Sequence, residues 1–248
     1  MPMLTERRLA ERPARSVWMF VASFAVWVST AHATDFCMTD PRVEAVDSSA
    51  PVTQSFLDQI KAIGIRTIIR YYDHEDETLP GKTLRRGERD AILMNGLKMG
   101  VVFQHRNDKF ASFTALRGRQ DGERSLILAA ENAQPRGSAI YFGVDGPWHT
   151  PYELANIMEY FREVNARLGG SGYRVGVYGS GLVCNALLAN GLAALCWLAA
   201  PTSWPEFSAW YQTKRWRLVQ LPTTQCGGRS VDFNLANGPE AEYGQFGR

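Results

Sequence analysis

Three aspartates lie in or directly after short apolar runs of the sequence, a placement that could assemble a carboxylate site. Asp47 ends the first such run, Asp145 ends the fourth and Asp232 lies within the eighth. In glycoside hydrolysis one carboxylic acid protonates the leaving oxygen, while a second carboxylate stabilises the cationic centre or orients water. An acid held against apolar surface has a raised pKa, which suits the proton donor. We interpret Asp145 as the candidate general acid and Asp47 and Asp232 as its partners; the alternative is that each aspartate caps a helix or turn.

A charged residue, Arg70, interrupts the apolar run from Thr67 to Tyr72. A charge in such a run is almost never buried without a partner. We expect Arg70 to form a salt bridge with one of the three aspartates, which would keep that aspartate ionised beside a protonated neighbour. The alternative is an internal structural ion pair elsewhere in the fold.

Aromatic and amide side chains near the ends of the apolar runs could bind a sugar. Trp148 and Trp197 could cover the apolar face of a sugar ring, while Tyr72, Tyr178 and Gln220 could hydrogen-bond its hydroxyl groups. The alternative for each is packing or local hydrogen bonding. Together with Arg70, these residues are the predicted substrate-binding set.

The elements that must position these residues alternate between short strands and amphipathic helices. This alternation indicates parallel strands joined by crossover helices, and eight strands predict one closed (β/α)8-type TIM barrel. The glycine fingerprints of nucleotide-binding sheets are absent from the sequence. The predicted strands are 43–47, 67–72, 99–104, 139–145, 174–178, 196–199, 217–221 and 230–234, and the predicted helices include 53–63, 84–96, 122–133 and 151–168.

The first 33 residues have the pattern of a signal peptide. Four arginines precede an uncharged run from Ser16 to Ala31, and Ala31-His32-Ala33 is a small-residue cleavage site. The apolar part is shorter than the roughly 20 residues of a spanning helix, so we expect cleavage and not a retained anchor. We therefore predict a signal peptide over 1–33, a single barrel domain over 34–248, no membrane association after cleavage, and a periplasmic or extracellular location.

Charge and cysteine usage limit the possible partners and cofactors. Without residues 1–33, which carry four Arg and two Glu, the formal net charge of +2 falls to zero, which argues against a nucleic-acid partner. The three remaining histidines are scattered and no Cys-x-x-Cys pair occurs, so we predict no metal and no cofactor. The four cysteines predict two disulfides, for which three pairings are possible. Spacing favours Cys184 with Cys196, and Cys37 would then pair with Cys226 where the first and last strands meet.

The ordered motifs resemble a known family, the glycoside-hydrolase-like domain once catalogued as domain of unknown function 1906, which is related in fold to the glycoside hydrolase family 25 lysozymes. The resemblance implies a (β/α) barrel with a cleft at the carboxyl ends of its strands, a proton-donor role for Asp145 and substrate-positioning roles for Asp47 and Asp232. The family 25 lysozymes carry Asp-x-Glu after the fourth strand, where this chain has Gly143-Val144-Asp145. The matching motifs are 46–49 (VDSS), 69–72 (IRYY), 140–145 (IYFGVD), 175–180 (VGVYGS), 196–199 (CWLA) and 231–234 (VDFN).

Three functions remain open at this stage. The first is an exported hydrolase of a β-linked glycan, for example peptidoglycan, with acid catalysis by Asp145. The second is a catalytically inactive, carbohydrate-binding or cell-wall-associated barrel that keeps the cleft and its aromatic residues. The third is a structural or partner-binding protein outside the cytoplasm.

Overall fold

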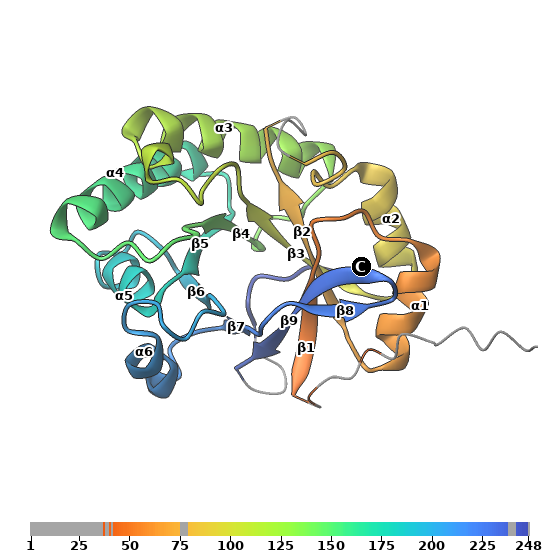
Figure 1. The fold of residues 1–248 in the computed structure, drawn as a ribbon. Helices are drawn as coiled ribbons and strands as arrows, with labels where there is room; N and C mark the ends of the chain where they lie inside the picture. Colours follow the sequence, from red (N-terminus) through yellow and green to blue (C-terminus); the bar gives the residue numbers. More distant parts are fainter. Residues whose placement is uncertain (1–36, 38–39, 41, 75–78, 238–241, 248) are drawn as a thin grey trace, which may run out of the picture. The chain divides into compact units, whose positions relative to one another are not determined.

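The computed structural model describes residues 37, 40, 42–74, 79–237 and 242–247, all within one compact unit, Asp35–Arg248. The predicted signal peptide lies outside the described residues. Eight strands close into a barrel in the order β1-β2-β3-β4-β5-β6-β7-β9, with β9 pairing back onto β1 (Figure 1). The prediction of a TIM-like α/β barrel is therefore confirmed. The barrel strands are β1 (Val43–Asp47), β2 (Thr67–Tyr72), β3 (Lys98–Phe103), β4 (Ala139–Gly143), β5 (Arg174–Gly179), β6 (Leu195–Leu198), β7 (Leu218–Gln220) and β9 (Arg229–Ala236).

The last barrel strand departs from the predicted parallel arrangement. β9 runs antiparallel to both β1 and β7, because the chain returns through a hairpin with β8 (Thr224–Cys226) instead of crossing over through a helix. Its early residues therefore lie at the same end of the barrel as the carboxyl ends of the other strands. This reversal places Asp232 directly opposite Asp47 in the register of the pair.

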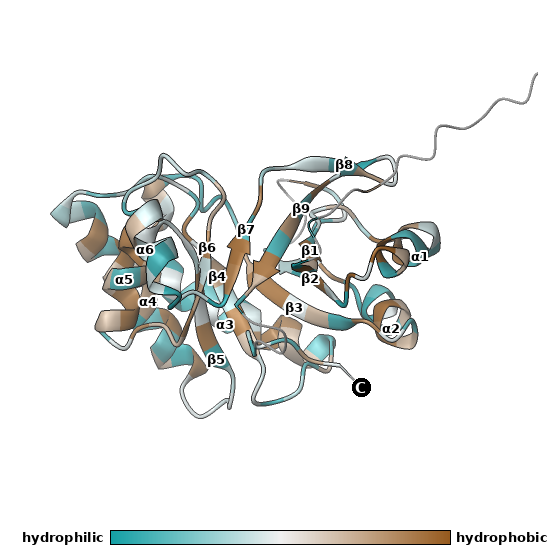
Figure 2. Ribbon diagram, turned by 90° about the horizontal axis from the view of Figure 1, so that it is seen from below, coloured by the Kyte–Doolittle hydropathy of each residue, from teal (hydrophilic) through white to brown (hydrophobic). Residues whose placement is uncertain are grey.

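Six helices cover the barrel in the described part of the chain. Figure 2 shows brown, apolar residues along most barrel strands and both colours on the helices, as expected for helices with one buried face. Thr53 and Thr150 cap α1 and α4 as their positions before helical runs predict, and Thr150 forms a full capping box with Glu153. The helices are α1 (Gln54–Ala62), α2 (Arg86–Met94), α3 (Ala115–Glu131), α4 (Pro151–Leu168), α5 (Gly181–Ala189) and α6 (Phe207–Thr213), with a short 3-10 turn at Phe110–Ser112.

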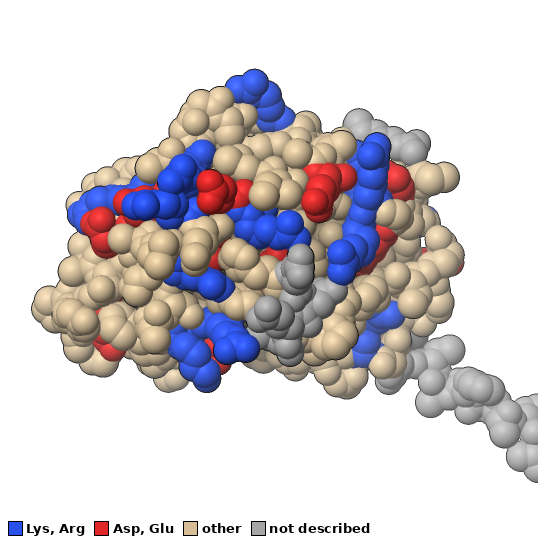
Figure 3. All heavy atoms as spheres, turned by 90° about the horizontal axis from the view of Figure 1, so that it is seen from above, with Lys and Arg blue, Asp and Glu red and all other residues tan. Residues whose placement is uncertain are grey.

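Helix α3 begins earlier than the sequence predicts, because its glycines serve helix packing and not termination. A Cβ on Gly118 would lie 2.2 Å from the carbonyl oxygen of Tyr160 in α4, so only glycine permits this close approach. An ion pair between Arg119 and Glu163 also joins the two helices at 3.1 Å. On the face seen in Figure 3, basic and acidic side chains are interspersed.

Alternate strand residues point into the barrel or out towards the helices. Inside, rings such as Tyr141, Trp197 and Tyr243 pack with small and branched residues into a core that is separate from the outer one. The C-terminal segment closes one end, where the Tyr243 hydroxyl donates to Thr67 Oγ1 at 2.7 Å. The opposite end, at the carboxyl ends of β1 to β7, carries the polar residues.

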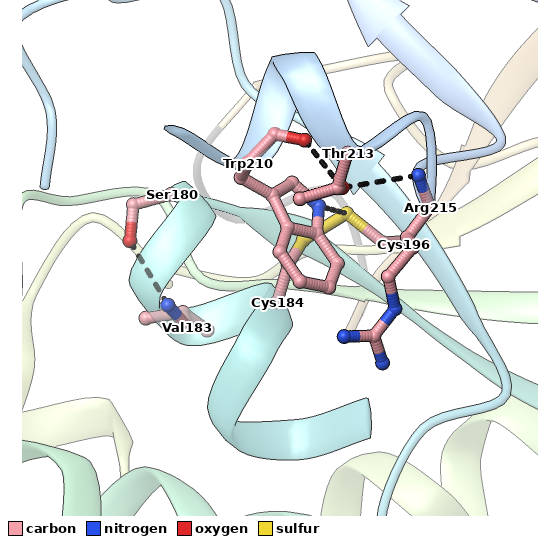
Figure 4. Close-up of a disulfide and its surroundings, with 7 residues drawn as sticks. All are labelled: Ser180, Val183, Cys184, Cys196, Trp210, Thr213 and Arg215. Atoms are coloured by element: carbon pink, nitrogen blue, oxygen red, sulfur yellow. Dashed lines mark hydrogen bonds between the residues drawn. A yellow bond between two sulfur atoms is a disulfide. The ribbon is translucent and has the colours of Figure 1, made fainter. Parts of the chain in front are cut away.

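Both predicted disulfides are present. Cys37 pairs with Cys226 and thereby joins the start of the barrel domain to the β8–β9 hairpin, whose Arg229 lies over the Phe56 ring of α1 at 4.5 Å. Cys184 of α5 pairs with Cys196 of β6, and the Trp210 indole nitrogen donates to the Cys196 sulfur at 3.1 Å (Figure 4). The pair of disulfides fits an exported protein.

Candidate functional site

Two of the predicted aspartates form a pair at the open end of the barrel. The Gln220 side-chain nitrogen donates to both, at 3.3 Å to Asp47 Oδ2 and 3.2 Å to Asp232 Oδ2. Asp47 also accepts from the Tyr71 hydroxyl and from Asn234 Nδ2, each at 2.9 Å. The carboxylates of neighbouring strands thus share a single amide donor.

Neighbouring aromatic side chains fix the orientation of both amides. The Tyr178 hydroxyl donates to Gln220 Oε1 at 2.8 Å, and the Trp197 indole nitrogen donates to Asn234 Oδ1 at 2.7 Å. Because each amide oxygen is occupied as an acceptor, each amide nitrogen is left to donate to the carboxylates. The network therefore supplies neutral donors in a defined direction.

The environment of the pair favours its protonated form. Burial, followed by repulsion from Asp232, raises the pKa of Asp47 to about 7, against the opposing hydrogen bonds of Asn234, Tyr71 and Gln220. Burial also raises the pKa of Asp232. Asp232 Oδ1 is buried without a hydrogen-bond partner among the described residues. Two acids this close behave as one unit that holds a proton between them over part of the pH range.

Asp145 lies two residues beyond the end of β4 and belongs to a separate hydrogen-bonded group. Its Oδ2 accepts from Gln104 Nε2 at 2.9 Å, and its backbone nitrogen donates to the Asn107 carbonyl at 3.0 Å. Burial, and secondarily the charge of Asp108, raises the pKa of Asp145. A carboxyl group in this state can donate a proton at a higher pH than an exposed aspartate.

Gly143 makes room for the Gln104 side chain. A Cβ on Gly143 would lie 3.2 Å from Gln104 Cγ, which is closer than ordinary contact. Gln104 therefore occupies space beside the position where Asp-x-Glu sequences carry their first acid. The residue that supports Asp145 is thus a neutral amide directly after β3 and not a second acid from β4.

A cleft of about 600 Å³ opens beside Asp145. Neither Asp47 nor Asp232 is among its lining residues, although the Asp232 charge contributes to raising the pKa of Asp145. The cleft is lined by Lys82, Gln104, Arg106, Asn107, Asp108, Lys109 and Asp145.

A second group of buried acids lies beside the cleft and has charged or imidazole partners. Asp73 contacts His105 Nδ1 at 2.5 Å and Lys82 Nζ at 3.4 Å. Asp121 contacts His74 Nε2 at 2.7 Å and Arg117 at 2.9 Å. Burial lowers the pKa of Lys82, and the charge of Asp73 opposes that shift.

Two of the predicted substrate-binding residues, Tyr178 and Gln220, lie in the site. The expected salt bridge of Arg70 with an aspartate of the site is wrong. Arg70 points outwards from β2, where its guanidinium pairs with Glu88 of α2 at 2.7 Å and donates to the Ser48 carbonyl. Since β2 residues alternate between faces, Arg70 and Tyr71 must point in opposite directions.

Tyr72 and Trp197 are also misplaced by the sequence interpretation. The Tyr72 hydroxyl donates to Gln134 on the outer side of the barrel, at 3.0 Å. Trp197 is inside the barrel and only 1% exposed, so it orients Asn234 and cannot cover a sugar ring. Trp148 is partly buried and packs with Phe110, with ring centroids 5.5 Å apart.

The sequence interpretation missed Tyr71, Asn234, Gln104 and Lys82. For Asn234 the signal was present, because it lies two residues after Asp232 and therefore on the same strand face. For Tyr71 there was none, because both faces of its strand are buried. Gln104 and Lys82 are brought to the cleft by loops, and no periodicity identifies them. No group of three His, Cys, Asp or Glu side chains that could hold a metal ion occurs among the residues the structure describes.

Comparisons with known proteins agree with this architecture. An uncharacterised Bacillus subtilis protein, FadG, is 24% identical over 222 residues, which cover 87% of this chain and 38% of FadG. The Mycobacterium tuberculosis Tat-secreted protein Rv2525c, in a crystal structure with HEPES, has a TM-score of 0.67 and 22% identity, over 82% of this chain and 98% of that one. The modular autolysin LytC of Streptococcus pneumoniae has a TM-score of 0.52 and 12% identity, over 77% of this chain and 46% of LytC.

No helix in the described part of the chain is both long and apolar enough to cross a membrane. The model of the family described as the Rv2525c-like, glycoside hydrolase-like domain matches residues 58–237, most of the barrel. The chain therefore belongs to this family of glycoside hydrolase-like domains.

Proposed function

We propose that this protein is an exported glycoside hydrolase that cleaves a cell-wall glycan such as peptidoglycan, or another β-linked glycan, with Asp145 as the general acid. The observation that carries the proposal is the position of Asp145 in the wall of a cleft, where burial raises its pKa, together with the Asp47–Asp232 pair at the same end of the barrel. Glycosidases need one acid that is protonated and one that carries negative charge.

In the proposed reaction, the bond between the anomeric carbon and the leaving oxygen breaks, and its electron pair goes to that oxygen. Asp145 transfers its proton to the same oxygen. The Asp47–Asp232 pair, holding one negative charge, stabilises the oxocarbenium-like centre, and water then adds to the anomeric carbon and releases a proton to the deprotonated carboxylate. Asp232, which is partly exposed, would face the substrate, while Asp47, only 1% exposed, sets the proton affinity of the pair.

The decisive experiment measures release of reducing ends from purified peptidoglycan and from other β-linked glycans. Asp145→Asn should lower the rate by about 100-fold or more, the scale of general acid catalysis, with little change in the unfolding midpoint. Asp108→Asn is the matched comparison, because Asp108 lines the same cleft but is exposed and paired with Lys109. The rate of hydrolysis should fall much less in this variant than in Asp145→Asn. Undiminished turnover in Asp145→Asn would refute its role as the acid.

A carbohydrate-binding barrel without turnover is the second candidate. The neutral Gln104 beside Gly143, where Asp-x-Glu sequences carry an acid, favours it. In that case wild type and Asp145→Asn would both lack turnover and both retain glycan affinity. Trp148→Ala should then weaken the affinity, because its partly exposed indole would cover the apolar face of the sugar.

Export is part of the proposal. The two disulfides and the signal-peptide pattern of residues 1–33 support it. N-terminal sequencing of the protein recovered outside the cytoplasm should find a start near Thr34, and an intact apolar run from Val17 to Val28 would contradict cleavage.

A further inference from the structure

Arg106 presents an unpaired positive charge at the cleft. It is exposed and lines both the 600 Å³ cleft and an adjoining hollow of about 350 Å³. No carboxylate forms an ion pair with it in the part of the chain that the structure describes. An arginine that faces a concave surface without an acidic partner is available to an anionic ligand.

The backbone of Arg106 is held in an unfavourable conformation. Its φ is 50°, in the left-handed region, and its carbonyl accepts from Ser112 Oγ at 2.8 Å and from the Lys109 nitrogen at 3.0 Å. An arginine in this region costs about 1 kcal/mol or more, which glycine or asparagine would largely avoid. An outlier of this kind at the edge of a cleft is a starting point for a functional hypothesis about its side chain.

Lys82 supplies a second cation in the same cleft. Its ammonium group donates to the Gln104 carbonyl at 2.6 Å, lies 3.4 Å from Asp73 and lies 5.2 Å from the centre of the Tyr71 ring. These contacts fix the ammonium close to Gln104, the residue that also binds Asp145. The lysine is therefore positioned beside the proposed proton donor.

The other charges of the cleft leave this positive character in place. Lys109 and Asp108 neutralise one another through a 2.7 Å ion pair. Asp145, as the proposed proton donor, is uncharged when substrate binds. Lys82 keeps Asp73 as its acidic partner at 3.4 Å, so Arg106 is the cation of the cleft whose charge no ion pair among the described residues offsets.

We infer that the cleft recognises a sugar carboxylate, with Arg106 as its unpaired charged contact and the ammonium group of Lys82 as a neighbouring donor, so that the preferred glycan carries a uronic-acid-type residue next to the bond that Asp145 protonates. This inference rests on the proposed function for the identity of the ligand as a glycan. A guanidinium matches the planar carboxylate through two parallel hydrogen bonds, whereas neutral hydroxyl groups would not compensate a cationic cleft in this way.

Calorimetric titration with two matched probes tests the inference. A β-1,4-linked tetraglucuronate and cellotetraose differ only in a carboxylate or hydroxymethyl group at C6. The tetraglucuronate should bind at least about 10-fold more tightly, and this preference should weaken with added salt, as charge-assisted hydrogen bonds require. The titrations use both wild type and Asp145→Asn, since the variant prevents turnover of the probes.

Arg106→Asn removes the charge at a residue type that tolerates the left-handed backbone, and it should lower tetraglucuronate affinity by about 10-fold while leaving cellotetraose affinity unchanged. Lys214→Asn is the matched control, because Lys214 is another cation with positive φ, at 56°, and does not line the cleft. It should change neither affinity.

The inference would be overturned by equal affinity for the two probes or by no measurable binding of tetraglucuronate. It would also be overturned if the Arg106→Asn variant preferred tetraglucuronate over cellotetraose as strongly as wild type does. A salt-sensitive preference for tetraglucuronate, without release of reducing ends from any glycan, would support the inference and refute the proposed hydrolysis. The two failures are therefore distinguishable.

Discussion

The buried acids at the open end of the barrel fall into two groups with different partners. Asp47, Asp232 and Asp145 receive hydrogen bonds mainly from amide and phenol groups. Asp73 and Asp121, although fully buried, contact lysine, arginine or histidine side chains. Asp47, Asp73 and Asp121 are all fully buried aspartates, so among these three the partner decides whether the carboxyl group is held ready to bind a proton or serves as one half of an ion pair.

The largest expected effect separates the two groups by stability. Asp73→Asn should lower the free energy of unfolding by about 3 kcal/mol, because it leaves the largely buried Lys82 without its acidic partner. Asp47→Asn should change the free energy of unfolding by less than about 1 kcal/mol at neutral pH. The asparagine oxygen can still accept hydrogen bonds from Asn234 and Gln220, and the repulsion with Asp232 disappears. Chemical denaturation of both variants measures the difference, and similar losses would remove the distinction between the groups.

The next effect concerns the pH dependence of stability. The folded-state pKa of Asp47 is raised from 3.8 to about 7, so between these values the folded protein binds more protons than the unfolded chain. The contribution of Asp47 to stability is therefore fully present below the unfolded pKa and is lost as pH rises through the folded pKa.

Thermal unfolding midpoints recorded from about pH 4 to about pH 8 should show this loss as a difference between wild type and Asp47→Asn. The variant should gain stability relative to wild type as pH rises, because its amide does not titrate. A difference that stays constant across the range would show that Asp47 has no raised pKa.

The sequence predicts the architecture better than the side-chain environment. Strand runs and caps such as Thr53 and Thr150 depend on local propensity and hydrophobic period, and these predict the barrel and most of its helices. The direction of β9 depends on the β8 hairpin, whose Gly227-Gly228 turn is a hairpin signal that the sequence interpretation did not use. Its reversal is what places Asp232 opposite Asp47.

The errors in the site have a common physical cause. Arg70 and Tyr72 lie on the face of β2 that points out towards the helices, whereas Tyr71 lies on the face that points into the barrel. A one-residue difference in register exchanges the two faces, and a run in which both faces are buried offers no polar alternation to decide between them. The partner of Arg70, Glu88, comes from α2, and only the packed fold brings them together.

The smallest expected effect tests these two faces through adjacent tyrosines. Tyr71→Phe removes a hydroxyl that donates to Asp47, and Tyr72→Phe removes one that donates to Gln134 outside the barrel. Each variant should lose about 1 kcal/mol of stability, the usual contribution of one hydrogen bond. Only Tyr71→Phe should raise the pKa of Asp47 further, since the lost hydrogen bond favours the ionised form.

The pH profile of stability distinguishes the two tyrosines even where the losses are equal. The cost of Tyr71→Phe should grow as pH rises, because the hydroxyl binds the carboxylate more strongly than the carboxylic acid. The cost of Tyr72→Phe should be the same at every pH, since its acceptor is an uncharged amide. If instead the stability lost in Tyr72→Phe depended on pH and that lost in Tyr71→Phe did not, the assignment of the two faces of β2 would be reversed. Tyr72, and not Tyr71, would then be the hydroxyl that donates to Asp47.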